Sequence, residues 1–464
     1  MNQETPKTPS QSESQPTEMF SAYRPRIMVK FHDSIQLPYE DGAEKYFDQH
    51  NARFWERFAR QFPGVTLKRV FTSLSPEKIR ELVARAAKTD KTYRPPNFLT
   101  YFAIECPTGI TPQTLIKALS NWEAIQTSYE DGAPAPHPAV GPTDDGYFPW
   151  QDYLDPAPLG IGVQCAWKQL GGDGEGMWFV DLEQNWDLHH PDLPDPPISL
   201  ISGLRRYEQS HGTSVLGIVV AVDNAEFHVG IAPKASARVI SEWRPADASR
   251  TNPADAIMEV IAMLRFGDVL LLETQYLRES DRSLWPSEGQ MAVRNAIRAG
   301  VALGIVVVEA AGNGGNNLDE YVDASGNRIL NQAGEDPDNS CAILVGAASA
   351  ALPHSRVRSS NFGKRVNCYA WGESVNTLDA EEPLFTANFS GTSSASAIVA
   401  GAALVIQGIA KKKFGRCYEP RELRSILSNQ GTPSGNPATD RIGVMPDLCK
   451  IIQNLREPIP RPDM

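Results

Sequence analysis

Apolar and polar positions predict two structural units in this chain of 464 residues. In the larger unit, short apolar runs typical of buried strands alternate with longer segments typical of helices. The expected elements are strand 177–181, helix 211–221, strand 237–241, helix 253–265, strand 268–273, helix 289–302, strand 304–309, strand 341–347 and helix 393–413. This alternation predicts an α/β fold, a doubly wound parallel sheet flanked by helices.

The smaller unit, residues 24–131, has the pattern of an α+β domain. Its expected elements are strands 26–31, 65–71, 98–105 and 124–129, and helices through 54–58, over 75–88 and from 111. Ser75-Pro76 and Thr111-Pro112 are typical helix starts, because Ser or Thr caps the helix and Pro suits its first position. Two βαβ-like halves predict a ferredoxin-like sandwich, to which the helix over 75–88 is an addition.

Composition sets the boundaries of the units. Residues 1–23 are rich in Gln, Ser, Thr, Pro and Glu, which predicts a disordered tail without the apolar stretch of a signal peptide. A Pro-rich linker at 132–149 precedes the larger unit at 150–455, and residues 456–464 form a C-terminal tail. Since no signal peptide is visible, we expect a cytoplasmic protein. Since no run reaches the roughly 18 apolar residues of a membrane span, we expect no membrane partner.

Charge and cysteine content narrow the function classes. The net charge of −12 disfavours nucleic acid as a partner, because phosphate contacts need clustered Lys and Arg. The six cysteines are too few and too dispersed for a disulfide scaffold or a zinc site, and buried free thiols are expected. Pairing of Cys341 with Cys368, or of Cys417 with Cys449, stays open.

Four polar residues stand where the predicted elements would place chemistry. Ser393 follows a Gly-Thr pair in a turn that opens a helix of small residues, beside the unpaired N–H groups of a helix N-terminus. A nucleophilic serine needs a base, and the base needs an orienting carboxylate. His211 opens a second glycine-containing turn, and Asp181 ends an apolar strand. Asn313 ends another strand, where its amide would donate to an oxyanion.

Taken alone, the Ser393 segment also fits an ordinary cap on a close-packed helix. The order Asp181, His211, Asn313, Ser393 favours chemistry instead, and here the chain resembles the subtilisin family of serine proteases. The matching segments are Asp181 with His190-Pro191-Asp192-Leu193, His211-Gly212-Thr213, Gly230-Ile231-Ala232-Pro233, Ala311-Gly312-Asn313 and Gly391-Thr392-Ser393. The resemblance extends from about Pro149 to about Leu455.

The resemblance implies a serine endopeptidase that acts through an acyl-enzyme on Ser393. It implies a catalytic triad of Asp181, His211 and Ser393, with Asn313 in the oxyanion hole. The substrate-binding residues that it implies are Glu273, Thr274, Gln275, Ala310, Ala311 and Gly312. Departures such as Ser394, where the family often has Met, put substrate preference in doubt and leave the chemistry in place.

The N-terminal unit is similar to the propeptide domain that subtilisin-like enzymes often carry. The resemblance therefore implies a zymogen with two kinds of partner: a protein or peptide substrate, and the chain's own N-terminal domain as chaperone and intramolecular inhibitor.

Two acidic residues, Glu273 and Glu309, stand in segments that by resemblance form opposite walls of the substrate cleft. A carboxylate that faces the cleft would favour a Lys or Arg of the substrate. Alternatively, both are buried, hydrogen-bonded structural groups. Alternation along each strand decides between these interpretations, and the sequence leaves both open.

The resemblance implies no cofactor for catalysis, but it does suggest a structural calcium ion. The segment at 222–228 aligns with the family's calcium loop, and the ligands would be oxygens of Asp192, Val222, Asn224, Glu226 and His228. Phe227 stands where the family has Gly, and a bulky residue tolerates positive φ poorly. An ordinary surface loop is the alternative.

Two other functions are compatible with the same fold. One is a catalytically silent binding or scaffold protein, and the other is an esterase or peptide ligase that uses the same acyl-enzyme. The intact set of four chemical groups favours the endopeptidase.

Overall fold

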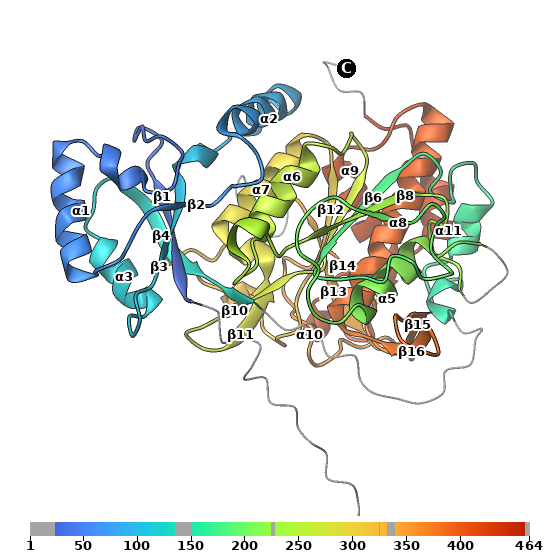
Figure 1. Ribbon diagram of the computed structural model, residues 1–464. Helices are drawn as coiled ribbons and strands as arrows, with labels where there is room; N and C mark the ends of the chain where they lie inside the picture. The colour runs from blue at the N-terminus through green and yellow to red at the C-terminus, as the bar shows by residue number, and fades with distance from the viewer. Residues whose placement is uncertain (1–23, 135–150, 224–227, 324, 332–338, 460–464) are drawn as a thin grey trace, which may run out of the picture.

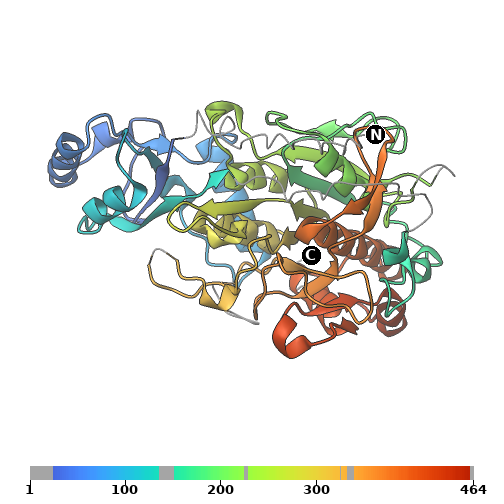
Figure 2. The ribbon, with the colours of Figure 1, turned by 90° about the horizontal axis from the view of Figure 1, so that it is seen from below.

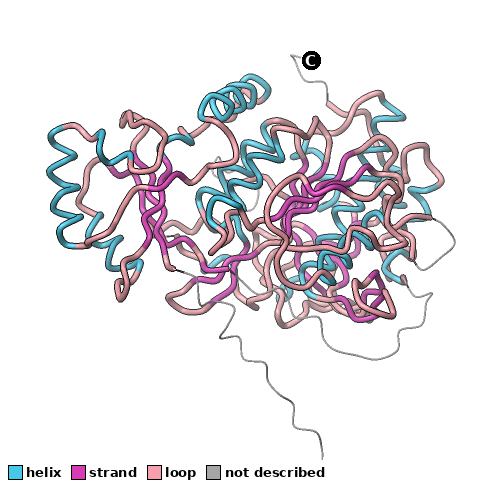
Figure 3. The backbone as a smooth tube through the Cα atoms, in the orientation of Figure 1, coloured by secondary structure: helices cyan, strands magenta, loops and turns pink. Residues whose placement is uncertain are grey.

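The computed structural model describes residues 24–134, 151–223, 228–323, 325–331 and 339–459. The predicted N-terminal tail and nearly all of the predicted linker lie outside the described residues. The described chain forms a small sheet on one side and a large sheet with its helices on the other (Figure 1). Figure 3 shows the strands of the two sheets as separate groups.

The large sheet has nine strands in the order β17-β18-β14-β13-β12-β9-β6-β8-β7. Its strands are β6 (Trp178–Glu183), β7 (Ser199–Leu200), β8 (Ser236–Ser241), β9 (Val269–Leu272), β12 (Val306–Ala310), β13 (Ile343–Ala348), β14 (Cys368–Trp371), β17 (Gly431–Pro433) and β18 (Val444–Pro446). Neighbours are parallel except for the edge pair of β17 and β18. The predicted doubly wound, mostly parallel sheet is confirmed.

Helices cover both faces of this sheet. Its helices are α4 (Val163–Trp167), α5 (Ser210–Val220), α6 (Pro253–Ile261), α7 (Met291–Ala302), α8 (Gly391–Phe414), α9 (Pro420–Asn429), α10 (Pro437–Asp440) and α11 (Leu448–Asn454). Strand alternation divides the core between the faces: Phe179 and Leu271 pack with α5 and α8, whereas Val180 and Leu270 pack with α6 and α7. The same alternation decides toward which face of the sheet each side chain on a strand points.

Helix α8 runs through the centre of the larger unit. By length and composition, it is the one helix in the described part of the chain that could cross a membrane, yet its apolar window is entirely buried inside the molecule. Such burial is expected of the central helix of a globular core.

The N-terminal sheet has four strands in the order β2-β3-β1-β4, and all its neighbours are antiparallel. Its elements are β1 (Arg26–Phe31), α1 (Gln49–Gln61), β2 (Lys68–Arg69), α2 (Pro76–Thr89), β3 (Tyr101–Glu105), α3 (Pro112–Leu119) and β4 (Ile125–Asp131). Ser75 and Thr111 cap α2 and α3 by accepting hydrogen bonds from backbone N–H groups. The strand order is compatible with the predicted ferredoxin-like sandwich. Of the strand expected at 65–71, only Lys68 and Arg69 pair with a neighbouring strand, β3.

The N-terminal unit packs against α6 and α7, with which it shares one hydrophobic cluster. Figure 2 shows the two units side by side from a second direction. Asp255 of α6 accepts hydrogen bonds from the backbone N–H groups of Thr72 and Ser73, at 2.7 and 2.8 Å. The Tyr129 hydroxyl accepts one from the N–H of Ala292, at 2.8 Å. The contact between the units is therefore both apolar and hydrogen-bonded.

Directly after β4, the chain adds a strand to the larger unit. Strand β5 (Ala133–Pro134) pairs antiparallel with β10 (Gln275–Arg278), which also forms a hairpin with β11 (Ser283–Pro286). A second hairpin joins β15 (Val375–Leu378) and β16 (Phe385–Phe389). None of these strands was expected from the sequence.

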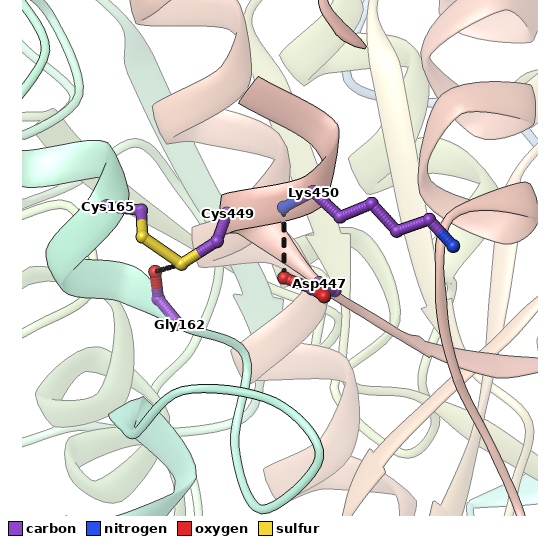
Figure 4. The surroundings of a disulfide bond; sticks show 5 residues. All are labelled: Gly162, Cys165, Asp447, Cys449 and Lys450. Atoms are coloured by element: carbon purple, nitrogen blue, oxygen red, sulfur yellow. Dashed lines mark hydrogen bonds between the residues drawn. A yellow bond between two sulfur atoms is a disulfide. The ribbon is translucent and has the colours of Figure 1, made fainter. Parts of the chain in front are cut away.

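The expectation that all cysteines are free is wrong. Cys165 of α4 and Cys449 of α11 form a disulfide with a Cα–Cα distance of 5.2 Å (Figure 4). The two residues are 284 positions apart, so local spacing gave no indication of the pair. Cys341, Cys368 and Cys417 are buried free thiols, which excludes both pairings that the sequence had left open.

Candidate active site

Ser393 lies in the first turn of α8. Gly391 begins the helix with a φ of 88°, a conformation that glycine adopts without strain, and this turn brings the serine to the end of the sheet. The first N–H groups of a helix have no acceptor within the helix, and Ser393 is among these positions. The helix N-terminus is therefore suited to stabilise negative charge beside the Ser393 hydroxyl.

His211 is the second residue of α5, and its ring contacts a carboxylate. The imidazole Nδ1 lies 2.7 and 2.8 Å from the two carboxyl oxygens of Glu183, and both side chains are buried. Gly212 makes this approach possible, because a Cβ there would lie 2.4 Å from the Trp186 ring and from the carbonyl oxygen of Asn185. The pair joins the end of β6 to the start of α5.

The prediction that Asp181 orients the histidine is wrong. One Asp181 carboxyl oxygen, Oδ2, accepts a hydrogen bond from the indole Nε1–H of Trp186 at 2.7 Å, and Glu183 takes the place beside His211. The physical reason is the length of the strand. β6 continues to Glu183 instead of ending at Asp181, and residues two apart on a strand point to the same face. The last acidic residue of the strand reaches His211.

Burial shifts the pKa of each of these groups toward its neutral form. It lowers the pKa of His211 to about 4, so the imidazole is neutral at neutral pH. It raises the pKa of Glu183 well above the usual range, against a hydrogen bond from the backbone of Gln184. It also raises the pKa of Asp181, where the neighbouring Glu183 acts in the same direction. An ionised Glu183 that accepts the Nδ1–H of His211 fixes the imidazole tautomer in which Nε2 is the basic nitrogen.

Asn313 is held against the turn that contains Ser393. Its side-chain oxygen accepts a hydrogen bond from the backbone N–H of Thr392 at 2.9 Å, which leaves the amide nitrogen as the donor. The preceding Gly312 has a φ of 89°, and its N–H donates to the Thr392 hydroxyl at 3.2 Å. Two segments about 80 residues apart in the chain thus meet at the N-terminus of α8.

Comparison with known families decides the class of the protein. Residues 203–443, more than half of the chain, match the subtilase family. The chain belongs to the subtilase family. Its relatives are serine proteases, and the protein is a subtilisin-like serine endopeptidase at this family level.

Two relatives of this subtilase align over most of their own length. The intracellular serine protease of Paenibacillus polymyxa is 27% identical over 292 residues, which cover 60% of this chain and 79% of that protein. The major intracellular serine protease of Bacillus subtilis strain 168 is 26% identical, over 60% of this chain and 83% of its own.

A solved structure shares the fold. Fervidolysin from Fervidobacterium pennivorans, a keratinolytic enzyme related to subtilisin, superposes with a TM-score of 0.56 at 16% identity over 93% of this chain. The chain spans 61% of the length of fervidolysin. At this identity the likeness shows the fold alone.

The predicted substrate-binding residues of the subtilase occupy two neighbouring strand ends. The Thr274 and Ser287 hydroxyls are 2.7 Å apart, and the Gln275 side-chain oxygen accepts from the N–H of Asn313 at 2.9 Å. Ala310 ends β12, and the N–H of Ala311 donates to the carbonyl oxygen of Val345 at 2.9 Å. Both strand ends therefore lie near the Ser393 turn, and their role toward substrate stays a prediction.

The two carboxyl groups that the sequence placed in the cleft walls point in different directions. Glu309 lies on the same face of β12 as Val307, and its Oε1 accepts a hydrogen bond from the N–H of Glu288 at 2.9 Å. Burial and the neighbouring Glu288 raise its pKa. Glu273 lies on the opposite face, the face of α8, where it contacts Ser396. For Glu309, a buried structural role is thus supported.

The calcium prediction is tested only in part. Asp192 is buried, and its Oδ2 accepts a hydrogen bond from the N–H of His228 at 3.0 Å. Val222 donates its N–H to the Asp192 carbonyl oxygen, and Asn224 and Glu226 lie outside the described residues. Among the residues that the structure describes, no group of three or more His, Cys, Asp or Glu side chains is arranged to hold a metal ion. The calcium site stays a prediction, which the melting temperature in excess chelator tests.

Proposed function

We propose that this subtilase hydrolyses peptide bonds with a triad of Glu183, His211 and Ser393, and that its N-terminal unit restrains it as a zymogen. The contact of 2.7 Å between His211 Nδ1 and Glu183 carries the triad assignment, because it supplies the oriented base that the serine needs.

The mechanism follows from these groups. His211 takes the Ser393 proton at Nε2 while Ser393 Oγ attacks the carbonyl carbon of the scissile bond. Glu183 keeps the Nδ1–H tautomer and stabilises the imidazolium that forms. The imidazolium then protonates the leaving amine, and the C–N bond breaks to leave an acyl-enzyme. Water, deprotonated by His211, hydrolyses the ester and restores Ser393.

Two donors are available for the oxyanion of the tetrahedral intermediate. They are the Asn313 amide nitrogen, oriented by Thr392, and the backbone N–H of Ser393 at the start of α8. One such donor typically contributes about 3–4 kcal/mol of transition-state stabilisation. The N-terminal end of α8 adds a favourable electrostatic field.

Restraint by the N-terminal unit is supported by the pairing of β5 with β10. The pairing is antiparallel, with Ala133 opposite Leu277 and Pro134 opposite Tyr276. The chain at Pro134 therefore runs toward Gln275 and Glu273, that is, toward the nucleophile. Strand addition of this kind is how an extended peptide substrate binds to a sheet edge, so the segment competes with substrate.

The compartment is proposed from two observations. The names of the two bacterial relatives, both intracellular serine proteases, favour a cytoplasmic location. The disulfide between Cys165 and Cys449 is typical of oxidising compartments instead. We propose the cytoplasm, with the disulfide as a bond that forms when the protein meets an oxidant.

Active-site labelling and self-processing test the proposal together. A fluorophosphonate probe should label the wild-type protein, and the label should map to Ser393. Ser393→Ala should remain a folded, unlabelled and full-length chain, whereas the wild-type chain should be cut between Pro134 and Gln151. Cleavage of purified Ser393→Ala at the wild-type rate would contradict self-processing. A folded wild-type protein without label would support the silent scaffold instead.

A further inference from the structure

A third acidic side chain lies at the nucleophile. Glu273 directly follows β9, its N–H donates to the Leu182 carbonyl oxygen at 3.1 Å, and it lies on the face of the sheet that packs against α8. The residue is only 7% exposed. A carboxyl group in this position requires a physical account, because burial of an ionised carboxylate is costly unless it is compensated.

The hydrogen bonds of Glu273 lead to the first turn of α8. Glu273 Oε1 lies 2.5 Å from the hydroxyl of Ser396, and that hydroxyl also contacts the carbonyl oxygens of Thr392 and Ser393, at 2.8 and 3.0 Å. The Ser393 side chain is itself close enough to the carboxyl to influence its pKa. The second carboxyl oxygen, Oε2, is buried and has no hydrogen-bond partner in the described part of the chain.

Proton counting at Ser396 favours a neutral Glu273. The hydroxyl has one proton and faces three oxygens, two of which are carbonyl oxygens that can only accept. A protonated Glu273 completes the set, because its Oε1–H donates to Ser396 Oγ and Ser396 donates to the Thr392 carbonyl. The arrangement also leaves Oε2 as an uncharged carbonyl oxygen, for which burial without a partner costs less than for a carboxylate.

The surrounding charges act in the same direction. Asp181 and Glu183 of β6 raise the pKa of Glu273 by repulsion, after burial, which is the larger cause. The hydroxyls of Ser396 and Ser393 on α8 lower it. The other titratable side chain at this end of the sheet, His211 of α5, is neutral at neutral pH. A negative Glu273 would therefore lack a compensating positive charge from this base.

We propose that Glu273 is a positioning residue for the nucleophile and must carry its proton for the enzyme to turn over. This inference rests on the proposed function. The neutral carboxyl holds Ser396 and with it the turn that presents Ser393. If Glu273 lost the proton, a negative charge would lie beside the developing oxyanion and oppose it. Activity should consequently fall on the alkaline side as Glu273 ionises.

The test compares Glu273→Gln, Glu273→Ala and Glu242→Gln with wild type, by measuring kcat and KM for one fluorogenic peptide amide across pH. The glutamine amide can donate to Ser396 and does not ionise. Glu242 is the matched control, because it is buried at the same end of the sheet but contacts Gln184, at 2.6 Å, and its pKa is raised to about 8. Circular dichroism confirms that each variant is folded.

We expect the alkaline loss of kcat to be abolished in Glu273→Gln and retained in Glu242→Gln. Glu273→Ala should lower kcat about a hundredfold with KM nearly unchanged, as misplacement of a reacting group does. The proposal is overturned if Glu273→Gln keeps the alkaline loss, or if Glu242→Gln abolishes it. Should the alanine variant not fold, the glutamine comparison still decides.

Infrared spectroscopy separates this proposal from the proposed function. In the Ser393→Ala background at neutral pH, a band of a protonated carboxyl should disappear when Glu273→Gln is added. If the band is present but the wild-type protein does not cleave peptides, only the proposed endopeptidase function is contradicted. If the band is absent, the proton assignment is overturned.

Discussion

Glu183 is the residue on which the proposed chemistry depends most directly. Its carboxyl oxygens lie 2.7 and 2.8 Å from His211 Nδ1, whereas Asp181 bonds to Trp186 at 2.7 Å. The two carboxyls share one face of β6 and differ only in which residue each reaches. A matched pair of isosteric substitutions therefore separates a catalytic from a structural carboxyl.

We predict that Glu183→Gln lowers kcat about a thousandfold or more, because the amide no longer stabilises the imidazolium. Asp181→Asn should stay within about tenfold of wild type, since the amide oxygen can still accept from Trp186. The measurement is kcat for a peptide amide, with thermal unfolding to confirm that both variants fold. Equal losses in the two variants, or the reverse order, would return the orienting role to Asp181.

The residues that the sequence identified are those with a local signal. Ser393, His211 and Asn313 each lie within two residues of a glycine that a positive φ or a close approach requires, and the structure brings all three segments to one end of the sheet. Glu183 carried no such signal, because its role depends on where β6 ends. The strand was expected to end at Asp181, and it ends two residues later. Ser396 was also missed, since its hydroxyl matters only through contact with Glu273, 123 positions away.

At the level of elements, the alternating strands and helices of the larger unit were predictable and most irregular additions were not. The β10–β11 hairpin escaped detection because its turn contains no glycine. Arg282 adopts the left-handed conformation there, with a φ of 56°, which non-glycine residues rarely do. Strand β5 was hidden because its partner belongs to that same hairpin.

The disulfide joins α4 and α11, which lie near opposite ends of the larger unit in the sequence but are neighbours in the structure. Closing a loop of 284 residues stabilises the folded chain by roughly 5 kcal/mol in the chain-entropy account. We predict that a reductant lowers the Tm of Ser393→Ala by about 5 °C. The measurement is calorimetry with and without reductant.

Adding Cys165→Ser and Cys449→Ser to that background provides the control. These substitutions should lower the Tm to the value of the reduced protein and remove its sensitivity to reductant. Cys368→Ser alters a buried free thiol and should leave that sensitivity in place. An unchanged Tm on reduction would show that the bond does not form in the purified protein.

At the scale of the whole molecule, the two units pack directly against each other and are not merely joined by a linker. Their apolar residues form a continuous cluster through α6 and α7, and Asp255, Tyr129 and Tyr101 add hydrogen bonds across the contact. The sequence predicted the two units but not this contact, because the apolar residues that form it have the same pattern as residues in the core of a single unit. Stability measured on the uncleaved chain therefore reports both units together.

Buried carboxyl groups give this body an unusual dependence on pH. Burial raises the pKa of Glu242 to about 8 and that of Glu130, at the contact between the units, to about 7. It also raises the pKa values of Asp181 and Glu273. In the unfolded chain, carboxyl groups have pKa values of about 4, so at neutral pH the folded state holds more protons than the unfolded state. Stability must then fall as pH rises.

We predict that the free energy of unfolding of Ser393→Ala, measured in urea, decreases steadily from about pH 7 to pH 9. His211 and His228 have folded-state pKa values lowered to about 4, and they act in the opposite direction only below about pH 6.5, where unfolded histidine becomes protonated. Above pH 7 they are neutral in both states, and the buried carboxyls set the slope. Above about pH 8 the buried thiols of Cys106, Cys368 and Cys417, whose pKa values are also raised by burial, add to it in the same direction. Glu242→Gln should flatten that slope because its amide does not ionise in either state. A free energy that stays constant or rises over this range would mean that these carboxyls are ionised in the folded protein.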